Sequence, residues 1–99
     1  MELNELVLLG NLLDIYGNIL TDKKKEILGM YVLDNMSYQE IAENLHISKP
    51  AVLDSIRVAT KKLNELEQKL GFLKFITNLQ KIVDKSTDIK KDLEKLLKE

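Results

Sequence analysis

Hydrophobic residues recur every three or four positions along almost the whole chain, and this spacing is typical of amphipathic helices. The alternating pattern of a β-strand is not found, and one proline and four glycines leave little room for sheet turns. The pattern therefore predicts an all-α fold. The expected helices cover residues 2–16, 21–34, 37–45, 48–70 and 72–83, with a last helix from residue 87.

Residues that favour helix caps mark three of the expected helix starts. Thr21 is placed to cap the second helix. Ser37 and Glu40 form an S-x-x-E capping box, which satisfies two backbone amides at the start of the third helix. Ser48 is placed to cap the fourth, with Pro50 in the first turn, where a missing N–H costs little. A short third helix and a long fourth helix are therefore expected.

Residues 37–59, "SYQEIAENLHISKPAVLDSIRVA", have the spacing of a helix-turn-helix. The small side chain of Ala42 lets two helices approach closely. His46 falls in the tight turn, where a residue with left-handed backbone is usual. The remaining packing positions are Ile41, Leu45, Ile47, Val52 and Ile56. An ordinary helical hairpin is the alternative structure for this stretch.

The fourth helix has an apolar seam with alternating steps of four and three residues, as in a heptad repeat. The seam consists of Val52, Ile56, Ala59, Leu63, Leu66, Leu70 and Leu73. It is longer than a small three-helix core can cover, and the first helix is apolar on more than one face. We therefore expect a homodimer, with contacts at Leu8, Leu12, Leu63, Leu66 and Leu70. In the alternative, a monomer folds its last two helices back over these surfaces.

The length of 99 residues predicts one helical domain over residues 1–99, with the helix-turn-helix at 37–59 and a C-terminal helical extension at 72–99. The chain has no cysteine, which excludes disulfides and thiolate zinc sites and fits a cytoplasmic protein. Polar residues interrupt the apolar amino-terminal segment. We therefore expect neither a signal peptide nor a membrane span there.

The formal net charge of −1 argues against a strongly electrostatic nucleic-acid binder. Residues 1–36 carry three lysines against six acids, residues 37–70 are balanced, and residues 71–99 carry seven lysines against five acids. If nucleic acid binds, the outer face of the fourth helix is the expected site, with the triple lysine at 23–25 next. The expected contacts are Ser48, Lys49, Leu53, Asp54, Arg57, Lys61 and Lys62.

No residue pattern typical of an enzyme is found. A paired-carboxylate cleft, a phosphate-binding loop and a nucleophile with its base are all missing from the sequence. His46 is the single histidine, and no second metal ligand stands near it. We therefore expect no catalytic residue, no metal and no cofactor.

The stretch "LTDKKKEILGMYVLDNMSYQEIAENLHISKPAVLDSIRVATKKLNELEQKLGF" resembles the YlxM family of small bacterial proteins, which is similar to the helix-turn-helix of sigma-factor region four. The most specific matches are residues 20–23, residues 40–43, and Ser48 with residues 51–52. The resemblance implies an all-helical, winged-helix-like core without a wing, often dimeric. It also implies a regulatory role in the signal recognition particle pathway, because family genes tend to lie beside the gene of its GTPase. Partners implied for the family include the RNA and protein of the particle.

The chain departs from the family at positions where bases would be read. The family tends to place Arg-Gln after the capping serine, whereas this chain has Lys49 and Pro50 and so lacks the fork that pairs with guanine and the amide that reads adenine. Asp54 would face phosphates unless it pairs with Arg57. These departures argue against direct base readout and favour phosphate or protein contacts.

Two functions are consistent with these patterns. One is a regulator that binds DNA or structured RNA through the fourth helix. The other is a protein-interaction module that docks the signal recognition particle GTPase without contacting nucleic acid. Salt separates them, because phosphate binding weakens steeply with ionic strength and an apolar protein contact does not.

Overall fold

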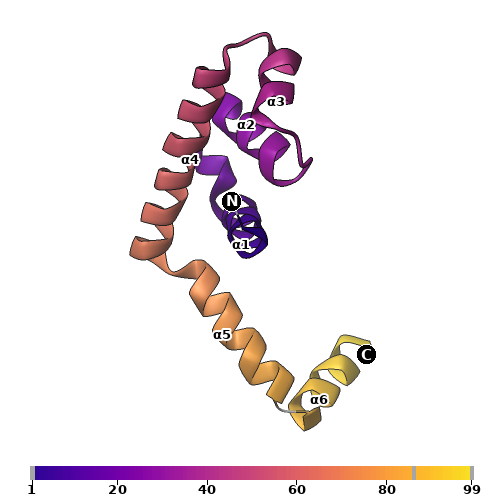
Figure 1. The fold of residues 1–99 in the computed structure, drawn as a ribbon. Helices are drawn as coiled ribbons and strands as arrows, with labels where there is room; N and C mark the ends of the chain where they lie inside the picture. The colour runs from indigo at the N-terminus through magenta and orange to yellow at the C-terminus, as the bar shows by residue number, and fades with distance from the viewer. Residues whose placement is uncertain (1, 86, 99) are drawn as a thin grey trace.

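The computed structural model describes residues 2–85 and 87–98 and is all-helical over that part of the chain, as the periodicity predicts. Figure 1 shows the order of the elements along the ribbon. They are α1 (Leu3–Tyr16), the 3₁₀ turn η1 (Gly17–Ile19), α2 (Asp22–Val32), α3 (Tyr38–Leu45), α4 (Lys49–Leu70), α5 (Phe72–Lys85) and α6 (Thr87–Lys98). Since these residues contain no strand, the helix-turn-helix has no wing there.

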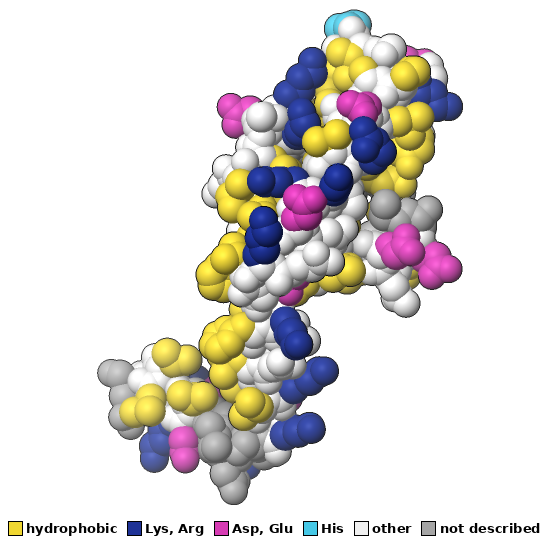
Figure 2. All heavy atoms as spheres, turned by 90° about the vertical axis from the view of Figure 1, so that its left-hand side faces the viewer, with side chains coloured by type: hydrophobic (Ala, Val, Ile, Leu, Met, Phe, Trp, Pro, Cys, Tyr) yellow, Lys and Arg dark blue, Asp and Glu magenta, His cyan; other side chains and the backbone are white. Residues whose placement is uncertain are grey.

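The molecule is elongated, with principal extents of 54 × 27 × 25 Å. Helices α1 to α4 form a body, and α5 and α6 form an arm that leaves the lower end of α4 (Figure 1). The arm carries a long row of exposed hydrophobic side chains, many of them visible as yellow spheres in Figure 2. On α5 these are Phe72, Phe75, Ile76, Leu79 and Ile82, and on α6 Leu93, Leu96 and Leu97. The arm therefore does not fold back to hide its own apolar face.

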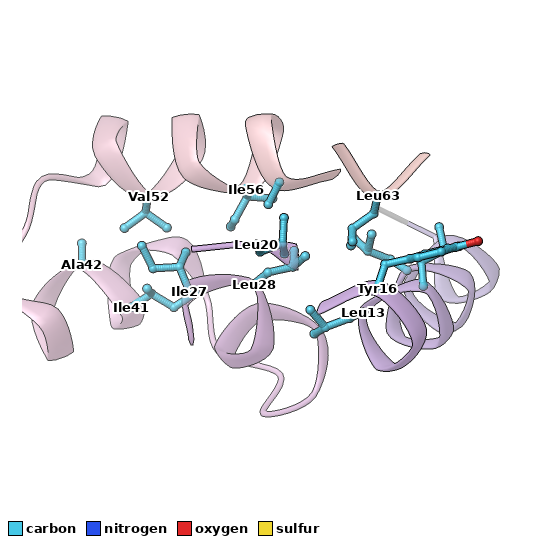
Figure 3. Close-up of a cluster of buried hydrophobic side chains, with 13 residues drawn as sticks. Leu13, Tyr16, Leu20, Ile27, Leu28, Ile41, Ala42, Val52, Ile56 and Leu63 are labelled. Atoms are coloured by element: carbon cyan, nitrogen blue, oxygen red, sulfur yellow. The ribbon is translucent and has the colours of Figure 1, made fainter. Parts of the chain in front are cut away.

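The core of the body lies between α4 and the three helices that cross it (Figure 3). Thirteen buried hydrophobic residues make up this core. They are Leu9, Leu12, Leu13, Tyr16, Leu20, Ile27, Leu28, Ile41, Ala42, Val52, Ile56, Ala59 and Leu63. Of the predicted seam on α4, Val52, Ile56, Ala59 and Leu63 lie in this core, and their burial removes apolar surface from water.

The helix-turn-helix is formed by α3 and α4, with the predicted caps in place. The Ser37 side chain accepts from the Glu40 amide while the Glu40 side chain accepts from the Ser37 amide, so the capping box is complete. Ser48 Oγ accepts from the Ala51 amide at 3.2 Å. His46 ends α3 with φ 56° and ψ 43°, the left-handed conformation expected of the turn. The predicted motif is confirmed.

The apolar seam of α4 is covered mainly by the chain itself, and this corrects part of the predicted subunit interface. Helix α1 lies across α4 and buries Leu63 completely, while Leu12 is only 1% exposed in the same core. Neither side chain can reach a second subunit. Of the other predicted contacts, Leu66 is partly buried against the core, whereas Leu8 and Leu70 are exposed.

The junction between α4 and α5 is held by side chains from α1 and α4. Gly71 ends α4 with φ 66°, a conformation that side chains with a Cβ rarely adopt. Glu67 then accepts from the amides of Leu73 at 3.0 Å and Lys74 at 3.1 Å, and so caps the start of α5. The arm therefore leaves the body in a defined direction.

Within the described residues, no helix is both long enough and apolar enough to cross a membrane.

Candidate nucleic-acid interface

The outer face of α4 presents a polar stripe that begins near the helix-turn-helix and runs toward the arm. Arg57, Lys61, Asn64 and Gln68 follow one another at intervals of four, three and four residues and are exposed. At 3.6 residues per turn, this spacing keeps the side chains on one side of the helix. Arg57 and Lys61 were predicted contacts. Asn64 and Gln68 were missed, although the same helical spacing extends to them.

A shallow groove lies along this stripe, between α4 and the start of α3. It is lined by Tyr38, Leu53, Ile56, Arg57, Thr60, Lys61, Asn64, Glu65 and Gln68. The exposed lining of the groove is mostly apolar, with Leu53 and Ile56 among its residues. The groove therefore places apolar side chains next to the polar side chains of the stripe.

Tyr38 joins the wall of the groove to α2 through a second tyrosine. Its hydroxyl donates to the Tyr31 hydroxyl at 3.3 Å, and the two rings are stacked with centroids 5.0 Å apart. The hydrogen bond from Tyr38, followed by burial, raises the pKa of Tyr31 to about 12. The Tyr31 hydroxyl is therefore neutral at physiological pH, and the tyrosine pair serves to fix the start of α3.

Arg57 and Asp54 form an exposed ion pair on the outer face of α4. Arg57 donates to Asp54 Oδ1 at 2.7 Å, and the two side chains are 69% and 66% exposed. An exposed pair of this kind adds little stability. Its main effect is on recognition, because Asp54 neutralises the guanidinium locally and occupies part of its hydrogen-bonding fork.

The remaining predicted contacts do not form one stripe with Arg57 and Lys61. Lys49 is turned about 80° around the helix from Arg57, and Lys62 about 100° from Lys61. Ser48 uses its hydroxyl oxygen as a cap, and Leu53, which is 41% exposed, lines the groove. The structure therefore brings Leu53, Arg57 and Lys61 together and leaves Lys49 and Lys62 on the flanks.

The lysines at 23–25 lie in the first turns of α2. Lys25 Nζ donates to Asn18 Oδ1 at 2.6 Å, so its charge is directed toward η1. Lys23 is exposed, and Lys24 is partly buried. The lysines at 23–25 are therefore a weaker candidate for a phosphate-binding site than the stripe on α4.

Charge is mixed over the face of α4 that Figure 2 shows. Basic side chains are spread along the helix, with acidic side chains between them. No group of three or more His, Asp or Glu side chains in the described part of the chain is arranged to hold a metal ion. Helix α4 therefore carries separate basic side chains along its length, and these can contact phosphates.

Comparison with known proteins gives consistent matches along the whole chain. The model of the family described as "UPF0122: Putative helix-turn-helix protein, YlxM / p13 like" matches residues 3–99. A UPF0122 protein of Fusobacterium nucleatum is 37% identical over 99 residues, covering 98% of this chain and 96% of the relative. Another, from Bacillus licheniformis, is 35% identical over 100 residues, covering 98% and 94%. A third, from Thermoanaerobacter sp., is 43% identical over 83 residues, covering 84% and 68%. This chain therefore belongs to the UPF0122 family of YlxM / p13-like helix-turn-helix proteins.

Proposed function

We propose that this protein is a regulatory, non-enzymatic helix-turn-helix protein that binds a nucleic-acid double helix through its phosphate backbone. The observation that carries the proposal is the exposed polar stripe on α4, in which Arg57, Lys61, Asn64 and Gln68 share one side of a rigid 22-residue helix. Cationic and amide side chains are the groups that contact phosphates and sugars. The intact turn and caps hold this helix as a helix-turn-helix protein holds its recognition helix.

Backbone contact is favoured over base readout by the residues near the start of α4. Specific readers of guanine and adenine use a free arginine fork or an unpaired amide. Here Pro50 offers neither group, Lys49 is a point charge, and the Arg57 fork is engaged by Asp54 at 2.7 Å. We therefore expect weak, salt-sensitive binding with little sequence preference.

Fluorescence anisotropy with labelled 24-bp DNA and RNA duplexes tests this proposal. Arg57→Glu combined with Lys61→Glu should weaken binding of both duplexes, or of the preferred one, strongly. Lys95→Glu combined with Lys98→Glu changes the net charge equally on exposed positions of α6 and should cost much less. Equal losses in the two double variants would show that net charge, and not the stripe on α4, supports binding.

The second candidate function is protein docking, and the exposed apolar arm is the observation that favours it. Contiguous apolar surface of this extent is unusual on a monomer and marks a binding face. On this proposal the protein docks the signal recognition particle GTPase without contacting nucleic acid; the link to that pathway rests on the family resemblance. A pull-down from extract with and without nuclease separates the two functions. Capture of the GTPase that persists after nuclease treatment and in high salt would favour docking.

We propose that a second copy of this chain binds the exposed hydrophobic side chains of the arm. If a large side chain presents about 150–250 Å² when fully exposed, the exposed parts of the eight arm side chains sum to about 700–1,200 Å². A standard interface buries about 800 Å² on each partner. A two-fold pair of arms would therefore suffice for a stable dimer and would place two copies of α4 for paired contacts on one duplex.

Sedimentation equilibrium at micromolar concentration tests the arm-mediated dimer. The wild type should sediment at about twice the chain mass of 11.4 kDa. Phe75→Glu places a charge on the apolar face and should give monomers, because an unpaired charge in an apolar interface is strongly unfavourable. Gln80→Glu, which adds the same charge at an exposed polar position of α5, should remain dimeric. A wild-type mass near 11.4 kDa would overturn the dimer.

A further inference from the structure

Helix α5 carries a basic stripe on a side of the helix that its apolar face does not occupy. Lys74, Asn78, Lys81 and Lys85 follow at intervals of four, three and four residues, and all are exposed. The spacing keeps them on one side of the helix. It is the same spacing as that of the polar stripe on α4, and the hydrophobic side chains of α5 occupy other positions of the helix.

The stripe on α5 is more strongly basic than the stripe on α4. Helix α5 contains three lysines and one acidic residue, Asp84. On α4, by contrast, Arg57 is paired with Asp54, and Glu65 lines the same groove as Lys61. The stronger attraction for phosphate is thus outside the helix-turn-helix.

The two stripes lie on the same side of the molecule. In Figure 2 the basic side chains on α4 continue downward into a vertical row of basic side chains on α5. The junction between the helices is fixed, because Glu67 accepts from the amides of Leu73 and Lys74 and the Tyr16 hydroxyl accepts from the Phe72 amide at 3.2 Å. The spacing of the two stripes is therefore built into the fold.

We infer that Lys81 and Lys85, with Lys74, form a second phosphate-contact site, which holds the same double helix that α4 contacts. This inference rests on the proposed nucleic-acid binding and extends it from the helix-turn-helix to the arm. The long axis of the molecule is 54 Å, and a duplex rises about 3.4 Å per base pair. A duplex of about 16 bp or more is therefore long enough to run along both stripes, whereas one of about 8 bp is about 27 Å long and cannot cover the full length of both.

The site also fits the proposed dimer, because the lysines of α5 and its exposed hydrophobic residues are at different positions around the helix. Pairing of two arms through Phe75, Ile76 and Leu79 would leave Lys81 and Lys85 accessible. The arm would then serve two purposes, with an apolar side for the second copy and a basic side for phosphate.

Anisotropy titrations with 8-bp and 24-bp duplexes, each as DNA and as RNA, test the inference. The test variant is Lys81→Gln combined with Lys85→Gln, which leaves Lys74 beside Glu67 unchanged. We expect the slope of log K against log salt for the 24-bp duplex to fall in magnitude by up to about 1.8, the value for two lost phosphate contacts. Binding of the 8-bp duplex to the α4 stripe should weaken much less. The form, DNA or RNA, that shows the larger length effect identifies the duplex for which the two stripes are spaced.

The matched control is Lys95→Gln combined with Lys98→Gln, at exposed positions of α6 with the same change in charge. An unchanged slope in the Lys81/Lys85 variant, or an equal change in the control, would overturn the inference while leaving α4 as the binding site. If the wild type binds neither duplex length, the proposed function itself fails and this inference fails with it. Helicity measured by circular dichroism confirms that each variant is folded.

Discussion

The hydroxyl of Tyr16, at the end of α1, donates a 2.8 Å hydrogen bond to Oε1 of Glu67, 51 residues further along the chain in α4. The same carboxylate caps α5 through two backbone amides, and the Tyr16 hydroxyl accepts from a third amide, that of Phe72. The ring centroids of Tyr16 and Phe72 are 6.2 Å apart, so the two aromatic rings pack beside these hydrogen bonds. One buried tyrosine and one glutamate thus connect three helices.

Glu67→Ala should loosen the start of α5 without unfolding the body. The amides of Leu73 and Lys74 lose their acceptor, and an amide without a partner exchanges with solvent more readily. Hydrogen exchange measured at these two residues should therefore accelerate, together with a fall in Tm. Glu65→Ala removes an acid from the same helix that makes no such contacts, and it should leave both measurements nearly unchanged.

The contribution of Glu67 should decline in acid. Burial raises the pKa of this carboxyl, but the hydrogen bonds from Tyr16, Leu73 and Lys74 outweigh burial and leave the pKa below its ordinary value of 4.5. A carboxyl with a depressed folded-state pKa stabilises the fold at pH values above its unfolded pKa, and this stabilisation is lost as the pH falls through the folded pKa. The Tm difference between wild type and Glu67→Ala should therefore be constant from pH 7 to 6 and shrink below about pH 4.5. A difference that stays the same at pH 3 would contradict the role of the charged form.

Ala42→Leu should destabilise the helix-turn-helix. Ala42 is 5% exposed where α3 crosses α4, and a larger side chain there forces the two helices apart. Overpacking of this kind costs about 1–3 kcal/mol, which urea unfolding can measure. Ala51→Leu makes the same change at an exposed position of α4 and is expected to be within about 0.5 kcal/mol of wild type. A neutral Ala42→Leu variant would refute the close packing at this crossing.

His46→Gly should stabilise the protein. His46 adopts φ 56°, a conformation that costs a residue with a side chain about 1 kcal/mol or more relative to glycine. Part of that gain is offset because glycine is more flexible in the unfolded chain, so the net increase in unfolding free energy should be below about 1 kcal/mol. His46→Val tests the opposite direction, since a β-branched residue is least suited to this backbone. Equal stability of the Gly and Val variants would show that the backbone of the turn relaxes.

Leu63→Ala should cost far more stability than Leu70→Ala, although both residues belong to the same apolar seam. Leu63 is completely buried by the body, and a buried Leu→Ala change costs about 2–5 kcal/mol. Leu70 is 52% exposed, so its replacement should change the unfolding free energy by about 0.5 kcal/mol. Comparable losses at the two positions would indicate that a partner covers Leu70 as fully as the body covers Leu63.

The sequence by itself determined where the capped helices begin and where the helix-turn-helix lies, whereas α2 ends at Val32, two residues before its predicted end. Ser37 with Glu40, Ser48 with Pro50, His46 and Gly71 act on backbone groups within four or five residues of themselves, so their effects can be read locally. The polar stripe of α4 is equally local, because it follows from 3.6-residue periodicity.

Only the tertiary structure decided which partner covers each apolar face. An amphipathic helix must bury its stripe, but the stripe does not specify the surface that covers it. Leu12 and Leu63 were therefore predicted to meet a second subunit, whereas α1 crosses α4 and buries both within one chain. The pairing of Tyr16 with Glu67, 51 residues apart, depends on that crossing. The Tyr16–Glu67 pairing sets the direction of α5. The placement of the exposed apolar and basic sides of the arm therefore depends on packing between distant segments of the chain.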